Sequence, residues 1–269
     1  MTKTILITGA TDGLGLETAR RLARDGHHLL VHGRNADKLA ATAHDLRSAP
    51  TAGKVETYLA DLSDLAEVAR LGRDLRDSQR RLDAVINNAG VLKLDHPLTA
   101  DGQDLRFVVN TLAPALLTRM LLPVIPQSGR IVHLSSAAQA PVDLAAMAGT
   151  RRLRAMDAYA QSKLALTMWS QSLAEELAAE GPVTVAVNPG SLLATDMVRK
   201  GFGVSGNDIG IGADILMRAA LSGEFATASG QYFDNDAGRF APPHPDAAKP
   251  QTVAAVVKAI EDRIAGYLT

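Results

Sequence analysis

Hydrophobic and polar positions alternate along this chain between two kinds of segment. The first kind is a short apolar run rich in β-branched or leucine residues, which is the pattern of a buried strand. Such runs occupy residues 4–7, 28–32, 55–59, 84–87, 130–134 and 184–188, with residues 229–233 as a weaker candidate. We therefore expect at least six strands.

The second kind of segment is longer and carries apolar residues at intervals of three and four, the repeat of an amphipathic helix. These segments occupy residues 14–25, 37–48, 65–79, 102–122, 158–180 and 210–221. Strands and helices thus follow one another in turn. Because the strands are too apolar to leave one face in water, the alternation predicts a parallel sheet covered on both sides. Right-handed crossovers then give a doubly wound, Rossmann-type α/β fold, and we expect a single domain over residues 1–269.

Two connections are longer than the others. Residues 137–157 contain an arginine cluster, and residues 234–250 are rich in proline, glycine and aspartate. Connections of this length inside a compact domain are functional lids or else disordered. An amphipathic helix is predicted for residues 251–267, and we expect it to pack on the core.

Composition narrows the class of protein. The chain has 269 residues, 46% of them hydrophobic and 21% charged, with a formal net charge of −1. Charges are scattered along helical segments, so there is no basic face for nucleic acid or a membrane surface, and we expect neither partner. The absence of cysteine excludes thiol catalysis, thiolate metal sites and disulfides. Metal catalysis is not expected either, because the seven histidines are dispersed and form no His-x-x-x-His pair.

The N-terminus enters an apolar strand at Thr4, which leaves no room for a secretory signal and predicts a cytoplasmic protein. The apolar stretch at residues 116–125 is interrupted by Arg119 and Pro123 and is shorter than the roughly 18 residues that a membrane-spanning helix needs. No transmembrane segment is predicted.

A glycine-rich turn joins the first strand to the first helix. Glycines allow a tight turn and close approach of the backbone to a pyrophosphate, and the helix N-terminus offers free N–H groups. Its position between strand and helix makes this turn a candidate dinucleotide site. The candidate residues in it are Gly9, Thr11, Asp12, Gly13, Leu14 and Gly15.

The residues at the end of the second strand indicate which dinucleotide fits, because the ribose 2′ position of a bound dinucleotide lies there. The residues are Gly33, Arg34 and Asn35. No carboxylate stands at this point to accept from a 2′-hydroxyl, whereas a guanidinium suits the oxygens of a 2′-phosphate. Arg34 and Asn35 are therefore candidate cofactor contacts, and NADP(H) is expected in preference to NAD(H).

Tyr159 and Lys163 lie four residues apart in a predicted helix and project from the same face. A free tyrosine has a pKa of about 10, and we expect the nearby ammonium to lower it so that Tyr159 can exchange a proton near neutrality. Ser136 ends the preceding strand and is placed to polarise a substrate oxygen. Asn110 is placed to hold a water molecule that connects Lys163 to solvent.

Taken in order, these motifs resemble the short-chain dehydrogenase/reductase family over nearly the whole chain. The residues that carry the resemblance are Thr8 to Gly15, Asp61-Leu62, Asn87-Asn88-Ala89-Gly90, Asn110, Ser135-Ser136, Tyr159-Ala160-Gln161-Ser162-Lys163 and Asn188-Pro189-Gly190.

The resemblance implies roles for these positions. Asn110, Ser136, Tyr159 and Lys163 would form a catalytic tetrad, with Lys163 also bonding the nicotinamide ribose. Further cofactor contacts would come from Asp61 and Leu62 at the adenine, from Asn88, Ala89 and Gly90 along the cleft, and from Pro189, Gly190 and Leu192 beside the nicotinamide. The family also implies a homo-oligomer, a dimer or tetramer, built from the helices that contain Asn110 and Tyr159.

Two departures from the usual family pattern stand out. The connection between Ser136 and Tyr159 contains an insertion. Together with Ser229-Gly230-Gln231-Tyr232-Phe233 and the terminal helix, it is similar to the retinol dehydrogenase and protochlorophyllide reductase branch. A threonine expected soon after Pro189-Gly190 occurs one position late, as Thr195, which is retained as a candidate nicotinamide contact.

The substrate is expected to be a small alcohol, ketone or aldehyde with an apolar body. Residues 91–98, 137–157 and 191–207 should shape its pocket, and they are rich in leucine, methionine and valine. Two other functions stay open on the same motifs. One is a dinucleotide-binding regulator without catalysis, against which the intact tetrad argues; the other is a sugar-nucleotide epimerase or dehydratase, against which the short segment after Pro189 argues.

Overall fold

The computed structural model describes residues 1–195, 197, 199 and 205–268. Within this part of the chain, eight strands form one sheet in the order β3-β2-β1-β4-β5-β6-β7-β8. The strands are β1 (Thr4–Ile7), β2 (His28–Gly33), β3 (Val55–Leu59), β4 (Ala84–Asn87), β5 (Arg130–Leu134), β6 (Val183–Asn188), β7 (Tyr232–Asp234) and β8 (Arg239–Phe240). The first seven pair in parallel, and β8 is antiparallel to β7.

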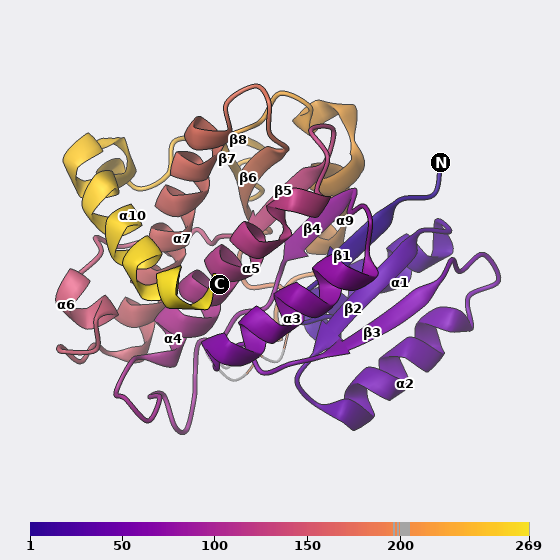
Figure 1. The fold of residues 1–269 in the computed structure, drawn as a ribbon, viewed down its shortest axis with the longest axis horizontal. Helices are drawn as coiled ribbons and strands as arrows, with labels where there is room; N and C mark the ends of the chain where they lie inside the picture. The colour runs from indigo at the N-terminus through magenta and orange to yellow at the C-terminus, as the bar shows by residue number, and fades with distance from the viewer. Residues whose placement is uncertain (196, 198, 200–204, 269) are drawn as a thin grey trace.

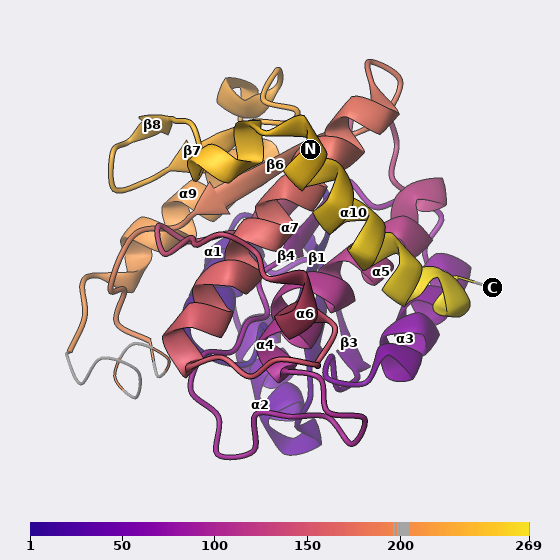
Figure 2. The same ribbon diagram turned by 90° about the vertical axis from the view of Figure 1, so that its left-hand side faces the viewer.

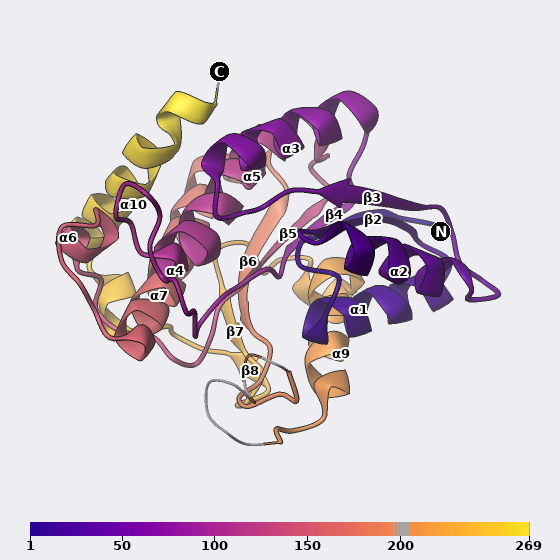
Figure 3. The same cartoon turned by 90° about the horizontal axis from the view of Figure 1, so that it is seen from below.

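Helices cover both faces of this sheet (Figures 1 and 3). The α-helices are α1 (Gly13–Arg24), α2 (Ala36–Arg47), α3 (Leu65–Ser78), α4 (Leu105–Phe107), α5 (Ala113–Leu121), α6 (Leu144–Met147), α7 (Ala155–Leu177), α9 (Ile209–Leu221) and α10 (Pro250–Ile264). One hydrophobic core lies between the sheet and α1, α2 and α9, and the other lies between the sheet and α3, α5 and α7. The predicted doubly wound Rossmann fold in a single α/β layer structure is confirmed.

Strand order reverses between β1 and β4, which lie side by side although β2 and β3 come between them in the chain. At such a point the loops after the two strands diverge to opposite faces of the sheet and leave a crevice at the carboxyl ends. The helix starts around it are capped by acidic or amide side chains: Asp12 accepts from the Gly13 amide at 2.7 Å, and Asn35 accepts from the Lys38 amide at 2.9 Å.

The helix predicted for residues 102–122 differs from the observed one at its start. Gly102 has a φ of +86°, outside the helical region, and Asp104 caps the helix that begins at Leu105. A π-helical turn, η1 (Val108–Leu112), then joins α4 to α5. The prediction of a continuous α-helix was therefore wrong, because a π-turn adds a residue that periodicity alone does not reveal.

The expectation that every strand is buried on both faces was wrong for β3. This strand lies at the edge of the sheet, and Leu59 at its end is 47% exposed. Two short elements, α6 and β8, were not predicted, and both lie in the two long connections. Those connections are ordered in the part of the chain that the structure describes.

The C-terminal helix α10 lies across the outer side of α5 and α7 (Figure 2), so its predicted packing on the core is confirmed. Glu261 holds it there by accepting hydrogen bonds from the indole N–H of Trp169 and from Arg119, both at 2.7 Å. The helices expected at an oligomer interface are thus covered by this chain's own α10. The homo-oligomer stays a prediction.

One helical run among the described residues, Leu105–Val124, has the length and apolar character of a membrane span. However, 78% of this apolar stretch is buried inside the protein. We interpret it as a core helix, which passes the same test because it packs between the sheet and α10.

Candidate active site

A cleft of about 640 Å³ opens at the carboxyl ends of the strands, where the strand order reverses. It collects most of the residues that the sequence singles out from far-apart motifs. The candidate residues that line it are Gly9, Thr11, Asp12, Gly13, Leu14, Gly15, Arg34, Asp61, Leu62, Asn88, Ala89, Gly90, Ser136, Tyr159, Lys163, Pro189, Gly190, Leu192 and Thr195. Asn35 and Asn110 are described by the structure but do not line it.

The glycine turn forms one end of the cleft. A Cβ added at Gly15 would lie 2.5 Å from Asn88 Nδ2 and still closer to the Gly9 carbonyl oxygen, so only glycine fits there. Asn88 Nδ2 donates to the carbonyl oxygens of Thr8 and Gly9, at 2.9 and 3.1 Å. The turn therefore has the tight, side-chain-free backbone that a pyrophosphate needs, and the N-terminus of α1 points its positive dipole end at the same place.

The end of β2 places Arg34 beside this turn. Arg34 is exposed and lines the cleft, whereas Asn35 caps α2 through its side chain. Lys38 adds a second positive charge nearby, with its Nζ 3.7 Å from Asp12. The role of Asn35 as a cofactor contact stays a prediction, because its side-chain oxygen is already used as a helix cap.

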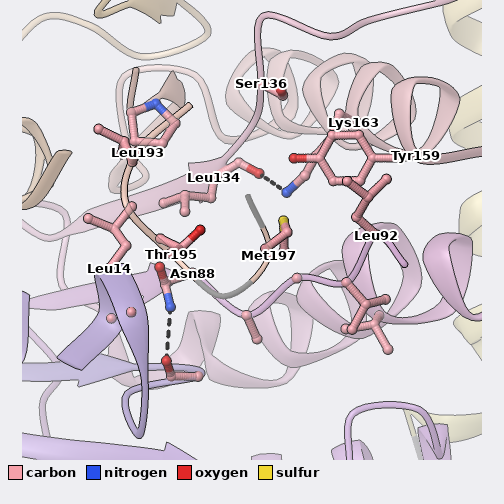
Figure 4. Close-up of a pocket in the computed structure, with 18 of the residues that line it drawn as sticks. Leu14, Asn88, Leu92, Leu134, Ser136, Tyr159, Lys163, Leu193, Thr195 and Met197 are labelled. Atoms are coloured by element: carbon pink, nitrogen blue, oxygen red, sulfur yellow. Dashed lines mark hydrogen bonds between the residues drawn. The ribbon is translucent and has the colours of Figure 1, made fainter. Parts of the chain in front are cut away.

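The side chains predicted to take part in catalysis, Ser136, Tyr159 and Lys163, lie at the other end of the cleft (Figure 4). Tyr159 and Lys163 project from α7, and Figure 4 shows the tyrosine hydroxyl and the lysine ammonium on the same side of that helix, with Ser136 close by. Lys163 Nζ lies 5.7 Å from the centre of the Tyr159 ring and donates to the Leu134 carbonyl at 2.7 Å. This arrangement places an acid–base pair next to the strand end that carries Ser136.

Burial sets the protonation of this pair. Desolvation raises the pKa of Tyr159, and its hydrogen bond with the Ser136 side chain lowers it by less. Desolvation also lowers the pKa of Lys163, to about 8. The expectation that the pKa of Tyr159 is lowered was therefore wrong, because desolvation of the buried phenol is the largest effect on it. A phenol with a raised pKa is instead kept protonated, as a proton donor should be.

Asn110 lies behind the cleft, fully buried in the π-turn η1. Its Oδ1 accepts from the Val91 amide at 2.8 Å, and its Nδ2 donates to the Val91 carbonyl and to Ser162 Oγ, each at 3.0 Å. A Cβ placed on Gly90 would lie 3.3 Å from Asn110 Oδ1 and 3.5 Å from Lys163 Nζ. Asn110 and Lys163 thus share a small space at Gly90, and the proposed water link between them stays a prediction.

The backbone carbonyl of Ser136 is held by two side chains that the sequence did not indicate. It accepts from the hydroxyl of Tyr232 at 3.1 Å and from Gln139 Nε2 at 3.0 Å. Gln139 Oε1 in turn accepts from the His244 amide at 2.8 Å. Through His244 and Gln139, the long connection at residues 234–250 is therefore linked to the backbone of Ser136 from outside the cleft.

A second group of hydrogen bonds fixes the backbone on either side of Pro189 and Gly190. Asn188 Nδ2 donates to both Asp234 and Asp236 at 2.9 Å, and Asp236 also accepts from the Ser191 amide at 2.8 Å. The neighbouring segment returns over the glycine turn, where a Cβ on Gly13 would lie 3.4 Å from Thr195 Cγ2. Residues 196, 198 and 200–204 of the predicted substrate loop lie outside the described residues.

Sequence reasoning missed His32. It was counted among dispersed histidines, yet it is 3% exposed, lines the cleft and accepts a hydrogen bond from the Gly9 amide. Its position just before Gly33-Arg34 was the available signal. The described part of the chain contains no group of three or more His, Cys, Asp or Glu side chains that could hold a metal ion.

The fold and the site together define an α/β oxidoreductase that uses a dinucleotide. A profile of the family "short chain dehydrogenase" matches residues 3–203. Retinol dehydrogenase 13 of Homo sapiens is 32% identical over 259 residues, covering 86% of this chain and 76% of that protein. The chain belongs to the short-chain dehydrogenase family, on its retinol dehydrogenase-like branch.

Solved structures agree with this assignment. An uncharacterized protein of Mycobacterium paratuberculosis has a TM-score of 0.78 and 30% identity, with 97% of this chain and 93% of that chain covered. A short chain dehydrogenase of Escherichia coli in complex with NADPH has a TM-score of 0.69 and 26% identity, with 87% and 96% covered.

Proposed function

We propose that this protein is an NADP(H)-dependent oxidoreductase acting on an uncharged alcohol or carbonyl compound with an apolar body. The observation that carries the proposal is the meeting of Ser136, Tyr159 and Lys163 in one cleft with the glycine turn. A bound nicotinamide supplies or accepts the hydride. The residues of the chain then have to position the reacting carbon and handle one proton.

In the reducing direction, the substrate carbonyl carbon takes the hydride while its oxygen takes the proton of Tyr159. Ser136 donates a hydrogen bond to the same oxygen and favours the developing negative charge. Lys163 holds positive charge beside the resulting phenolate, which eases its reprotonation from solvent. Oxidation of an alcohol follows the reverse course, with the phenolate as the base.

The preference for NADP(H) is supported by the charges around the end of β2. Arg34 is exposed in the cleft, and Asp12 and Asp61 are the carboxylates among the described residues that line it. Asp12 caps α1, and Asp61 Oδ1 accepts from the Ser63 amide at 2.9 Å. A ribose 2′-phosphate here would meet the guanidinium of Arg34, and the ammonium of Lys38, 3.7 Å from Asp12, offsets the charge of that carboxylate. The relative solved with NADPH is consistent with this choice.

The apolar substrate body is supported by the walls of the cleft near Tyr159. The lining residues contributed by residues 91–98, 137–157 and 191–207 are Val91, Leu92, Ala137, Ala138, Met156, Ser191, Leu192, Leu193, Thr195 and Met197. None of these described residues is charged, so at these positions the anion of a hydroxy acid or sugar nucleotide would find no charged partner. The similarity to a retinol dehydrogenase points the same way.

The test is to follow NADPH absorbance with a panel that includes retinal, aliphatic aldehydes, keto acids and sugars. We expect turnover with the apolar members, and a preference for NADPH over NADH of about tenfold or more that disappears in Arg34→Ala. An NADH preference that persists in this variant would overturn the cofactor assignment. Binding of NADPH without turnover of any carbonyl or alcohol would instead indicate a dinucleotide-binding regulator.

A further inference from the structure

The first peptide of the glycine turn is held at both of its polar ends. Its carbonyl, that of Thr8, accepts from Asn88 Nδ2 at 2.9 Å. Its amide, that of Gly9, donates to Nδ1 of His32 at 3.2 Å. Asn88 follows β4 and His32 belongs to β2, so the two side chains reach this peptide from strands on opposite sides of β1. The plane of the peptide is thereby fixed.

The partners of His32 determine its protonation. A backbone amide can only donate, so Nδ1 must carry a lone pair towards Gly9. On the other side, His32 Nε2 lies 3.0 Å from the Ala60 carbonyl oxygen, which can only accept, so Nε2 must carry the proton. The imidazole is therefore neutral, in one tautomer. Burial favours the same form, because desolvation lowers the pKa of His32 to about 4 against smaller opposing effects of Ala60 and Asp61.

The imidazole thus links the carboxyl ends of three neighbouring strands. His32 belongs to β2. Its ring accepts from the Gly9 amide, just after β1, and donates to the Ala60 carbonyl, directly after β3. Gly9 has a φ of +64°, so the chain reverses direction at the residue whose amide His32 holds. Without this acceptor, the part-buried Gly9 amide would lose this hydrogen bond, and the peptide would be held only at its carbonyl end, by Asn88.

We propose that His32 is a positioning residue for the dinucleotide: by fixing the peptide between Thr8 and Gly9, it prearranges the glycine turn for the pyrophosphate. This inference rests on dinucleotide binding in the proposed cleft. Prearrangement acts on binding, because an ordered turn loses less freedom when the ligand arrives. It does not act on proton transfer at Tyr159, which lies at the other end of the cleft. His32 should therefore control affinity for NADPH and leave turnover at saturation unchanged.

Two substitutions separate the two hydrogen bonds of the ring. His32→Asn places an amide oxygen where Nδ1 is and keeps an acceptor for Gly9. His32→Gln places its amide group near Nε2 and keeps the partner of Ala60, but it leaves Gly9 without an acceptor. His28→Gln, on the same strand but away from the cleft, is the control variant. Each is compared with the unsubstituted full chain by fluorescence titration with NADPH, by kcat at saturating NADPH and by thermal unfolding.

The expected result is that His32→Gln weakens NADPH binding about tenfold, the usual effect of losing one buried hydrogen bond, while His32→Asn stays within about threefold of the parent. Neither changes kcat, and His28→Gln changes neither quantity. Equal affinity in the two His32 variants, or losses that only follow thermal stability, would overturn the proposal in favour of a packing role. Failure of the unsubstituted chain to bind NADPH or NADH is a separate result, which would refute the proposed function.

Discussion

The two ends of the cleft are built differently. At the glycine turn, backbone atoms form much of the surface, and the buried His32 and the half-buried Asn88 hold them by hydrogen bonds. At the Tyr159 end, the described surface is made mostly of apolar side chains from three loops, beside the polar groups of Ser136, Tyr159 and Lys163. Backbone geometry presents the same amides whatever the side chains are, which suits an invariant pyrophosphate. Loop side chains can change without altering the sheet, which suits a specific substrate.

The strongest test of this difference is a methyl group added to the turn. In Gly15→Ala, the new Cβ would collide with the Gly9 carbonyl and lie 2.5 Å from Asn88 Nδ2. Because Gly9 belongs to the turn and Asn88 holds it by hydrogen bonds, we expect NADPH affinity to fall by about 100-fold or more, equal to about 2.7 kcal/mol. Gly223→Ala is the matched control, since a Cβ there meets nothing within 4 Å. Unchanged affinity in Gly15→Ala, measured by fluorescence titration, would show that the turn does not hold the cofactor.

A second test uses the pH dependence of the Tyr159 end. Burial lowers the pKa of Lys163 to about 8, so its ammonium is lost as pH rises through that value. We expect kcat for carbonyl reduction to fall about tenfold per pH unit above about pH 8, while NADPH binding at the turn changes little. In Lys163→Arg, the decline should move to higher pH because a guanidinium stays protonated.

The pH profiles of the parent protein and of Lys163→Arg, measured with saturating NADPH, also separate the effect of the charge at position 163 from the effect of the side chain's shape. Lys163→Arg should lose some activity at every pH, since its longer fork does not fit the contact with the Leu134 carbonyl. A flat profile between about pH 7 and about pH 10 in the parent protein, or the same decline in both proteins, would remove Lys163 from its assigned role.

A third and smaller effect is expected at the apolar residues that line the cleft near Tyr159. Met156 lines the cleft and is 38% exposed, so a charge there is tolerated by the fold but meets an apolar substrate. Met156→Asp should raise KM for retinal about five- to tenfold and leave KM for NADPH unchanged. Leu144→Asp is the control, because Leu144 is 40% exposed and belongs to the same insertion but does not line the cleft. An equal rise of both KM values would mean that Met156 is not specific to the substrate end.

The two ends also differ in how far the sequence predicts them. The strands and the glycine turn follow from local patterns, since a buried parallel strand is continuously apolar and only glycine permits the close approach at Gly15. The spacing of Tyr159 and Lys163 follows from helix geometry. These features depend on residues that are near one another in the chain.

What the sequence did not predict depends on contacts between distant residues. Tyr232 reaches the carbonyl of Ser136 across 96 positions, and no local pattern marks it. The raised pKa of Tyr159 results from burial, which spacing does not report. The covering of α5 by α10 depends on Glu261 meeting Arg119 and Trp169, and it bears on the predicted oligomer in a way that family resemblance did not suggest.

The most direct test of the account is the turnover of Tyr159→Phe with retinal or the best carbonyl of the panel, with NADPH titrated in parallel. Loss of the phenolic hydroxyl removes the proton donor but leaves the ring and the glycine turn in place. We predict that kcat falls about 1000-fold or more while the dissociation constant for NADPH stays within about twofold. Turnover at the rate of the parent protein would contradict the account, because the proton would then have to come from another group.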